Sequence, residues 1–270
     1  MVFAFGVIPL VVLIFARRNL RESERWLHLK EVKEAKRTGD ETAMHELAQR
    51  YQVDLDEVNQ PSVGQLLSKP GLIRRQLVLL TAVWFFYASA YVATNVYITY
   101  WLTHYAGWSG GQTATLLLIA GGFGFLFYVF GGALGERYGR KEVMLSAGVC
   151  VAPLNLLFYF VSLHQRHPMA VVFITWFLIF QATNGVWSGA GQGYWPESFP
   201  TRVRGTAVGW LGAMFAAGQL IGAGIWTLMI GSAGPTATWL VVAVGLACGQ
   251  YLAFGLKHIN PNQELEEIAT

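Results

Sequence analysis

Neutral polar side chains recur at helical spacing inside otherwise apolar stretches of this chain. One set follows at intervals of three or four residues: Gln181, Asn184, Ser188 and Gln192. That spacing places the side chains along one stripe of a helix. Tyr87, Tyr91 and Asn95 form a second such stripe, and Gln219 stands among glycines. Because amide and phenol groups both donate and accept hydrogen bonds, these residues are suited to bind the hydroxyls or carboxylates of a small solute.

An aromatic residue, Trp187, accompanies the first stripe and could stack on an apolar ring face of such a solute. The predicted substrate-lining residues are Tyr91, Asn95, Gln181, Asn184, Trp187, Gln192 and Gln219. The alternative interpretation is that these groups bond to one another across helix interfaces. There, each pair contributes about 0.6 to 2 kcal/mol to packing.

Charged residues lie instead at the ends of the apolar runs or in one polar segment, 17–75. The predicted gate comprises Glu136, Arg137, Arg140, Glu197 and Arg204. Ion pairs between helices in a partly dehydrated headgroup region outweigh exposed surface pairs, which contribute about 0 to 1 kcal/mol. We hypothesise that such pairs latch neighbouring helices in one transport state. The alternative is that these charges only anchor topology.

The elements that must position these groups are membrane-spanning helices. The chain is 54% hydrophobic and 13% charged, whereas soluble domains average about 25% charged residues. Six apolar runs occur, at about 76–103, 113–134, 143–164, 168–195, 205–231 and 235–256. A bilayer core of about 30 Å requires roughly 20 residues per helix, so each run is long enough to span. The bilayer interior offers the backbone no water, and we therefore expect regular helices.

The basic residues indicate an orientation. Of the 19 Lys and Arg residues, 18 lie in alternate connections or at the C-terminal end, and only Arg166 lies on the opposite side. By the positive-inside rule, the polar segment 17–75, the turn at 132–141 and the C-terminus are cytoplasmic. The net charge of +3 therefore reflects topology rather than nucleic-acid binding. Cys150 and Cys248 lie inside apolar runs, where we expect buried, inert thiols and neither metal nor disulfide.

Two loops and one partial motif resemble the major facilitator superfamily. The turn of Gly132, Glu136, Arg137, Gly139, Arg140 and Lys141 resembles the cytoplasmic loop signature of each six-helix half, with Glu where Asp is usual. Glu197, Pro200 and Arg204 resemble the loop between helices ten and eleven of sugar-porter-type facilitators, and residues 22–27 partly resemble the motif after helix six. The paired glutamines and tyrosines typical of the seventh helix are not evident in 76–103. Both a sugar and an aromatic acid or other carboxylate thus remain open as substrates.

The resemblance implies an all-α polytopic membrane bundle, the C-terminal six-helix half of that fold. Its expected parts are the end of helix six at 1–16, a cytoplasmic linker at 17–75, helices seven to twelve at 76–258 and a tail at 259–270. Because the run at 1–16 must enter from outside, we infer that about five and a half N-terminal helices are missing. The expected location is a bacterial inner membrane.

The implied function is secondary transport of a sugar or small organic acid by alternating access, with no cofactor. We expect proton coupling as a symporter, yet the spans hold no Asp, Glu, Lys or Arg at depth. A proton-carrying carboxylate is therefore expected in the missing N-terminal half, or the protein is a uniporter. A transporter-derived receptor or a polytopic membrane enzyme is the alternative of another class. An enzyme should cluster His, Asp, Glu or Ser at a membrane face, and the sequence offers only the ion-pair loops.

Overall fold

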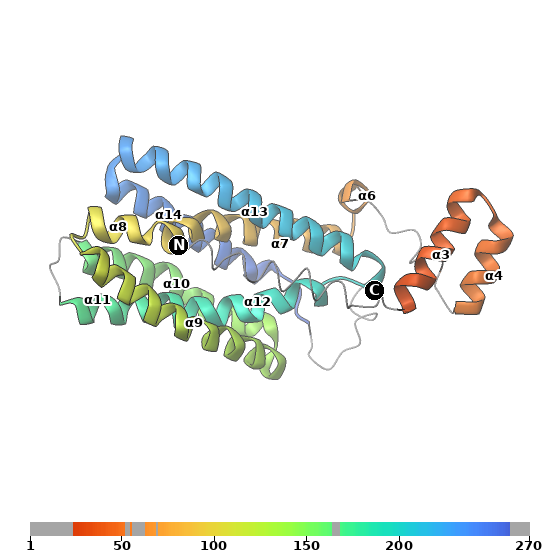
Figure 1. The fold of residues 1–270 in the computed structure, drawn as a ribbon, viewed down its shortest axis with the longest axis horizontal. Helices are drawn as coiled ribbons and strands as arrows, with labels where there is room; N and C mark the ends of the chain where they lie inside the picture. Colours follow the sequence, from red (N-terminus) through yellow and green to blue (C-terminus); the bar gives the residue numbers. More distant parts are fainter. Residues whose placement is uncertain (1–23, 52–54, 56–62, 69, 164–167, 260–270) are drawn as a thin grey trace. The chain divides into compact units, whose positions relative to one another are not determined.

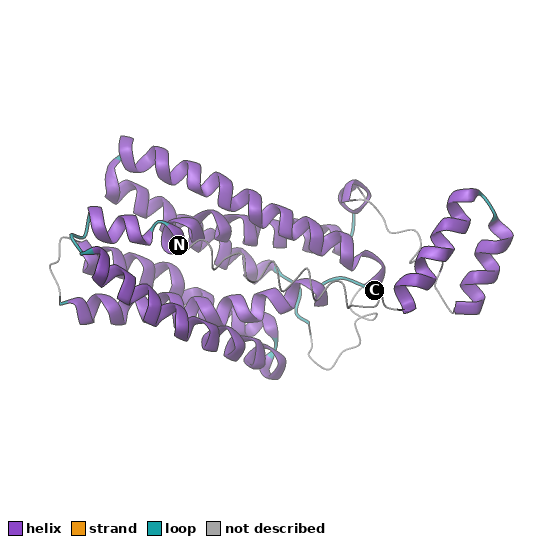
Figure 2. Cartoon of the chain, viewed as in Figure 1, coloured by secondary structure: helices purple, strands orange, loops and turns teal. Residues whose placement is uncertain are grey.

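The computed structural model describes residues 24–51, 55, 63–68, 70–163 and 168–259, and all regular structure in these ranges is helical (Figure 2). The chain divides into two compact units, residues 1–60 and 61–270. The predicted helix end at 1–16 lies outside the described residues, as does the tail from residue 260. The all-α class predicted from the sequence is confirmed.

The first unit contains a helical hairpin of α3 (Glu24–Thr38) and α4 (Glu41–Tyr51). Gly39 forms the turn with a φ of 76°, a left-handed conformation that glycine adopts without strain. Val32 and Ala48 are buried between the two helices, and the ring of His28 stacks on Tyr51 at 3.9 Å. The Tyr51 hydroxyl donates a 2.6 Å hydrogen bond to Glu31, which raises the pKa of the phenol.

The second unit is a bundle of long helices (Figure 1). Its elements are α6 (Val63–Ser68), α7 (Leu72–Tyr91), η1 (Val92–Val96), α8 (Ile98–His104), α9 (Gly110–Tyr138), α10 (Arg140–Ser162), α11 (Met169–Trp176), η3 (Phe177–Asn184), α12 (Gly185–Glu197), α13 (Thr201–Ser232), α14 (Gly234–Tyr251) and η4 (Leu252–Gly255). In the described residues, five stretches are long and apolar enough to cross a membrane: Leu72–Val96, Gly110–Tyr138, Arg140–Ser162, Val203–Ser232 and Gly234–Gly255. The predicted run at 168–195 is built from α11, η3 and α12 in direct succession. This unit is a polytopic membrane bundle.

Two of the predicted spans are not regular α-helices. The short segments η1 and η3 are π-helical, a geometry that shifts backbone hydrogen bonds by one residue and is frequent at functional sites. Polar side chains bond to backbone carbonyls there. Asn95 Nδ2 donates to Tyr91 O at 3.4 Å, and Thr183 Oγ1 donates to Leu178 O at 3.2 Å. The π-helical segments contain Asn95, Gln181 and Asn184, three of the predicted substrate-lining residues.

Glycines set how closely the helices approach. A Cβ at Gly189 of α12 would overlap the carbonyl oxygen of Tyr128 on α9, and one at Gly222 of α13 would overlap that of Ser89 on α7. These contacts are backbone to backbone, as small residues permit in membrane helix packing. In the resulting arrangement, α7 packs against α13 and α14, while α12 packs against α9 and α10 (Figure 1). The helices α7, α9, α12 and α13 then surround the site described next.

Candidate functional site

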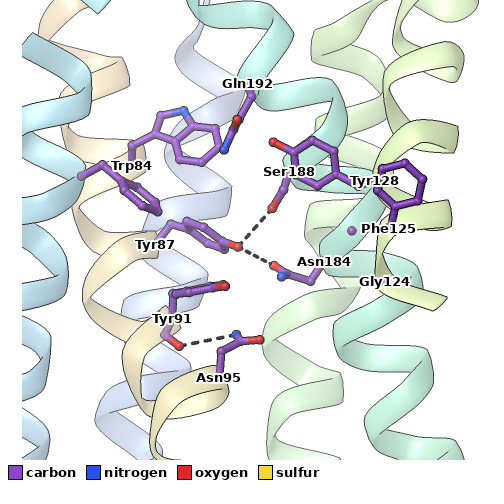
Figure 3. Close-up of a pocket in the computed structure, with 12 residues that line it drawn as sticks. Trp84, Tyr87, Tyr91, Asn95, Gly124, Phe125, Tyr128, Asn184, Ser188 and Gln192 are labelled. Atoms are coloured by element: carbon purple, nitrogen blue, oxygen red, sulfur yellow. Dashed lines mark hydrogen bonds between the residues drawn. The ribbon is translucent and has the colours of Figure 1, made fainter. Parts of the chain in front are cut away.

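A cavity of about 330 Å³ lies between α7, η1, α9, η3, α12 and α13 (Figure 3). It is lined by Trp84, Tyr87, Tyr91, Asn95, Gly124, Phe125, Tyr128, Asn184, Gly185, Ser188, Gln192 and Phe215. Its volume is in the range of small-molecule sites, which are concave and lined mainly by apolar and aromatic groups with a few polar ones. The cavity is therefore of a size and composition suited to a small polar solute.

Tyr87 is the centre of the polar network. Its hydroxyl donates to Asn184 Oδ1 at 2.9 Å and lies 3.1 Å from Ser188 Oγ (Figure 3). The side chain is 2% exposed, so these bonds tie α7 to η3 and α12 inside the bundle. Because Tyr87 occupies the carbonyl oxygen of Asn184, the amide nitrogen of Asn184 is left to donate to a bound solute.

A layer of aromatic side chains packs against this network. The Trp187 ring lies 4.4 Å from that of Tyr87 and 4.8 Å from that of Trp84, and Phe215 meets Trp84 edge to face at 5.9 Å. Trp84 and Trp187 are at most 1% exposed. Such pairs contribute about 0.5 to 1.5 kcal/mol beyond their burial. The layer fixes the rings that face the cavity.

The structure brings part of the predicted lining set together. Tyr91, Asn95, Asn184 and Gln192 all line the cavity. Trp187 does not, because its indole turns toward α10, where Gly148 leaves room: a Cβ at Gly148 would lie 3.1 Å from Trp187 Cδ1. Gln219 lies half-buried on α13, outside the lining. The side chain of Gln181 lies outside the described residues.

Several lining residues were not predicted from the sequence to line a site: Trp84, Gly124, Phe125, Tyr128, Gly185 and Phe215. Trp84 extends the stripe of Tyr87 and Tyr91 by one turn, so that stripe carried a signal for it. Phe125 and Tyr128 lie one turn apart on α9, but aromatic spacing alone does not separate a cavity wall from a lipid-facing surface. No periodic spacing in the sequence pointed to Phe215.

The cavity wall carries no ionisable charge at neutral pH. None of the residues that line it is Asp, Glu, Lys, Arg or His. Recognition on this side therefore depends on hydrogen bonds from amide, hydroxyl and phenol groups and on contact with aromatic faces. The described residues also contain no cluster of three or more His, Cys, Asp or Glu side chains that could hold a metal ion.

A second polar site lies at the end of the bundle that carries Arg74, Arg137, Arg140 and Lys141, which we name the basic end. Arg140 Nε donates to Glu197 Oε2 at 2.6 Å and so joins α10 to α12. Glu136 Oε1 lies 3.7 Å from the same guanidinium. The two side chains of the close pair are 15% and 30% exposed, so the pair is largely sheltered. The guanidinium lies directly over Gly193, where a Cβ would overlap it.

The other predicted gate residues have different partners. Arg137 lies over the ring of Tyr138 at 5.3 Å. Arg204 Nε donates to Phe199 O at 3.3 Å. Among the described residues, therefore, the ion pair that joins two helices of the predicted set is Arg140 with Glu197.

The second unit is thus a helical membrane bundle with a neutral central cavity. In a comparison with known proteins, residues 1–270 match the family described as sugar (and other) transporters. The chain belongs to that family, within the major facilitator superfamily, as the sequence motifs predicted. The description of this family and the names of the relatives given next are those of transport proteins.

Two curated relatives are similar to it. The chain is 26% identical over 277 residues to a probable metabolite transport protein, CsbC, of Bacillus subtilis (strain 168), covering 97% of this chain and 58% of the relative. It is 26% identical over 142 residues to a probable 4-methylmuconolactone transporter of Cupriavidus pinatubonensis, covering 52% of this chain and 32% of the relative. The chain thus spans less than two thirds of the length of these relatives.

Proposed function

We propose that this chain forms one wall of the pathway of a secondary transporter that moves a small polar solute, a sugar or small organic acid, by alternating access. The cavity around Tyr87 is the observation that carries the proposal. It combines neutral hydrogen-bonding groups from three spans with aromatic faces, and it lies between the long helices α9 and α13. The bundle lies in a lipid bilayer, because most of the outward-facing side chains of its long helices are apolar.

A second bundle would close this cavity on its open side. The helices α9 and α13, which flank the cavity, are the least buried of the five described spans, with Leu118 of α9 79% exposed and Leu220 of α13 77% exposed. A Cβ at Gly121 or Gly212 would meet nothing within 4 Å, so these glycines are not required for packing within the described bundle. Small residues are typical of helix contacts in membranes. We infer that the N-terminal six-helix half, for which the longer relatives have room, covers these two helices.

The aromatic wall supports a second substrate class. Trp84, Tyr128 and Phe215 suit a planar or puckered ring with an apolar face, and Asn184 and Gln192 suit its polar edge. A sugar fits this description, and so does an aromatic acid or other ring carboxylate moved by a symporter of the same superfamily. One relative is named for a lactone. A receptor derived from a transporter would have the same cavity but would not move the solute across the membrane.

Proton coupling is part of the proposal. Since no carboxylate lines the described cavity, the proton-binding group belongs to the second bundle. The proposed location is a bacterial inner membrane with the basic end and the C-terminus in the cytoplasm, in keeping with the positive-inside rule and the bacterial relatives. The Arg140–Glu197 pair then acts as a cytoplasmic latch, joining α10 to α12 until the inside opens.

Uptake into proteoliposomes tests this function. The protein is reconstituted together with its second bundle and offered a radiolabelled hexose, benzoate and a muconolactone, with and without an inward proton gradient. We expect saturable uptake of one class, stimulated by the gradient and lost in Asn184→Ala. The matched control is Asn155→Ala, which removes a buried amide on α10 outside the cavity. Saturable binding of a solute without its transport across the membrane would refute the transporter hypothesis and support the receptor hypothesis.

A further inference from the structure

Two hollows lie along the seam that α7 forms with η4 and α14, away from the central cavity. The first, of about 430 Å³, is at the basic end and includes Arg74, Arg75, Val78 and Gly255 in its lining. The second, of about 200 Å³, lies deeper between α7, α13 and α14. None of the residues that line either hollow lines the central cavity. Neither hollow therefore belongs to the proposed solute site.

Both hollows open on one face of the seam. On α7, Arg74 and Val78 of the first hollow are followed by Phe85 and Ser89 of the second, at spacings of four, seven and four residues. Such spacing keeps side chains on one stripe of a helix. From Arg75 to Phe86 the helix rises about 16 Å at 1.5 Å per residue. An acyl chain of a membrane lipid is long enough to cover that distance.

The first hollow combines two positively charged side chains with an apolar surface. Arg74 and Arg75 are exposed, and within the described ranges no carboxylate forms an ion pair with either guanidinium. Guanidinium groups bind phosphate oxygens through paired hydrogen bonds. Val78, 48% exposed, lies in the same hollow. The matching ligand is thus a phosphate attached directly to an apolar body.

The deeper hollow is suited to the apolar body itself. Its lining is almost entirely aliphatic and aromatic, with Phe86, Ile221 and Val244 partly open to the surroundings of the bundle. The Ser89 hydroxyl already donates to Phe86 O at 2.8 Å. Because this part of the chain spans a membrane, acyl chains are the molecules that reach an opening on its outer face. Polar solutes would lose their hydration there without gaining a partner.

We propose that the α7–α14 seam binds one anionic phospholipid, with its phosphate on Arg74 and Arg75 and an acyl chain in the deeper hollow. The lipid would bridge α7, which lines the solute cavity, and α14, which does not. A basic residue near an anionic leaflet strengthens binding about fivefold, so the two arginines together give roughly a 25-fold preference for an anionic over a zwitterionic headgroup.

Native mass spectrometry of the full chain in detergent tests the headgroup. The probes are dioleoylphosphatidylglycerol and dioleoylphosphatidylcholine, which have the same acyl chains. We expect one retained phosphatidylglycerol with roughly 25-fold preference, reduced to near parity in Arg74→Gln/Arg75→Gln. The matched control Lys36→Gln/Arg37→Gln removes an adjacent pair of exposed charges from α3 and should retain the preference. Equal binding of the two lipids by the unaltered chain would overturn the proposal, as would equal loss in both double variants.

The acyl-chain part has its own test. Val244→Trp fills the deeper hollow from an exposed position, whereas Leu240→Trp introduces the same side chain one turn away, outside the lining. We expect weaker retention of phosphatidylglycerol in the first variant and unchanged retention in the second. Glycerol 3-phosphate, which has the headgroup phosphate without the chains, should not displace the lipid at equal concentration. Displacement by glycerol 3-phosphate, or equal behaviour of the two Trp variants, would overturn the assignment to a lipid.

Discussion

Replacing Tyr87 by Phe removes one oxygen atom at the point where two spans meet, because α7 there contacts η3 and α12. The hydroxyl bonds to Asn184 Oδ1 at 2.9 Å and to Ser188 Oγ at 3.1 Å, and the side chain is 2% exposed. Hydrogen bonds within membrane proteins average about 0.6 kcal/mol, with a maximum near 1.7 kcal/mol. Two lost bonds should therefore lower the free energy of unfolding by about 1.2 kcal/mol, and at most by about 3.4 kcal/mol.

Equilibrium unfolding in mixed micelles of detergent and sodium dodecyl sulfate measures this change. Tyr97→Phe is the matched control, because Tyr97 stacks on Trp226 at 4.4 Å and no hydrogen bond of its hydroxyl is found in the described structure. A double-mutant cycle with Asn184→Ala isolates the bond between the two side chains. A loss for Tyr87→Phe within about 0.3 kcal/mol of that for Tyr97→Phe would refute the network.

The same substitution should also weaken solute binding. With the Tyr87 hydroxyl gone, the amide of Asn184 loses the bond that fixes its carbonyl oxygen, and its nitrogen is no longer held toward the cavity. A misplaced donor that costs about 1.4 kcal/mol lowers affinity tenfold. Titration of the solute identified by uptake measures this effect. Unchanged affinity in Tyr87→Phe would show that Asn184 is oriented by other contacts.

Three further perturbations follow from the contacts described above. Gly189→Ala should destabilise the bundle by about 1–3 kcal/mol in the same unfolding assay, because its Cβ overlaps α9; Gly121→Ala, which meets nothing, should leave stability unchanged. Glu197→Gln should shift the conformational equilibrium by up to about fivefold toward opening at the basic end, since a partly exposed pair contributes up to about 1 kcal/mol; unchanged accessibility of a cysteine placed at the basic end in both Glu197→Gln and Arg140→Gln would contradict the latch. Glu31→Gln should return the raised pKa of Tyr51 toward its usual value in an ultraviolet titration. The stability that this bond gives the α3–α4 hairpin is complete below the unfolded phenol pKa of about 10 and is lost as pH rises through the raised value.

The sequence determined the class of the protein and much of one cavity wall. Hydropathy and helical periodicity depend on residues close together in the chain, so the apolar runs and the stripes containing Asn184 and Asn95 could be recognised without a fold. The loop motifs around Glu136 and Glu197 indicated the superfamily in the same local way. The π-helical segments were not predicted, because a shift of one backbone hydrogen bond leaves hydropathy unchanged.

Only the tertiary structure decided which of these residues meet. Tyr87 bonds to Asn184 across 97 positions of sequence, and Arg140 pairs with Glu197 across 57. Trp187 turns away from the cavity because Gly148 leaves space for its indole on α10. Helix rotation and the closeness of helix packing set these partners. Both depend on where glycines from distant parts of the chain let backbones touch, which spacing within a single span does not encode.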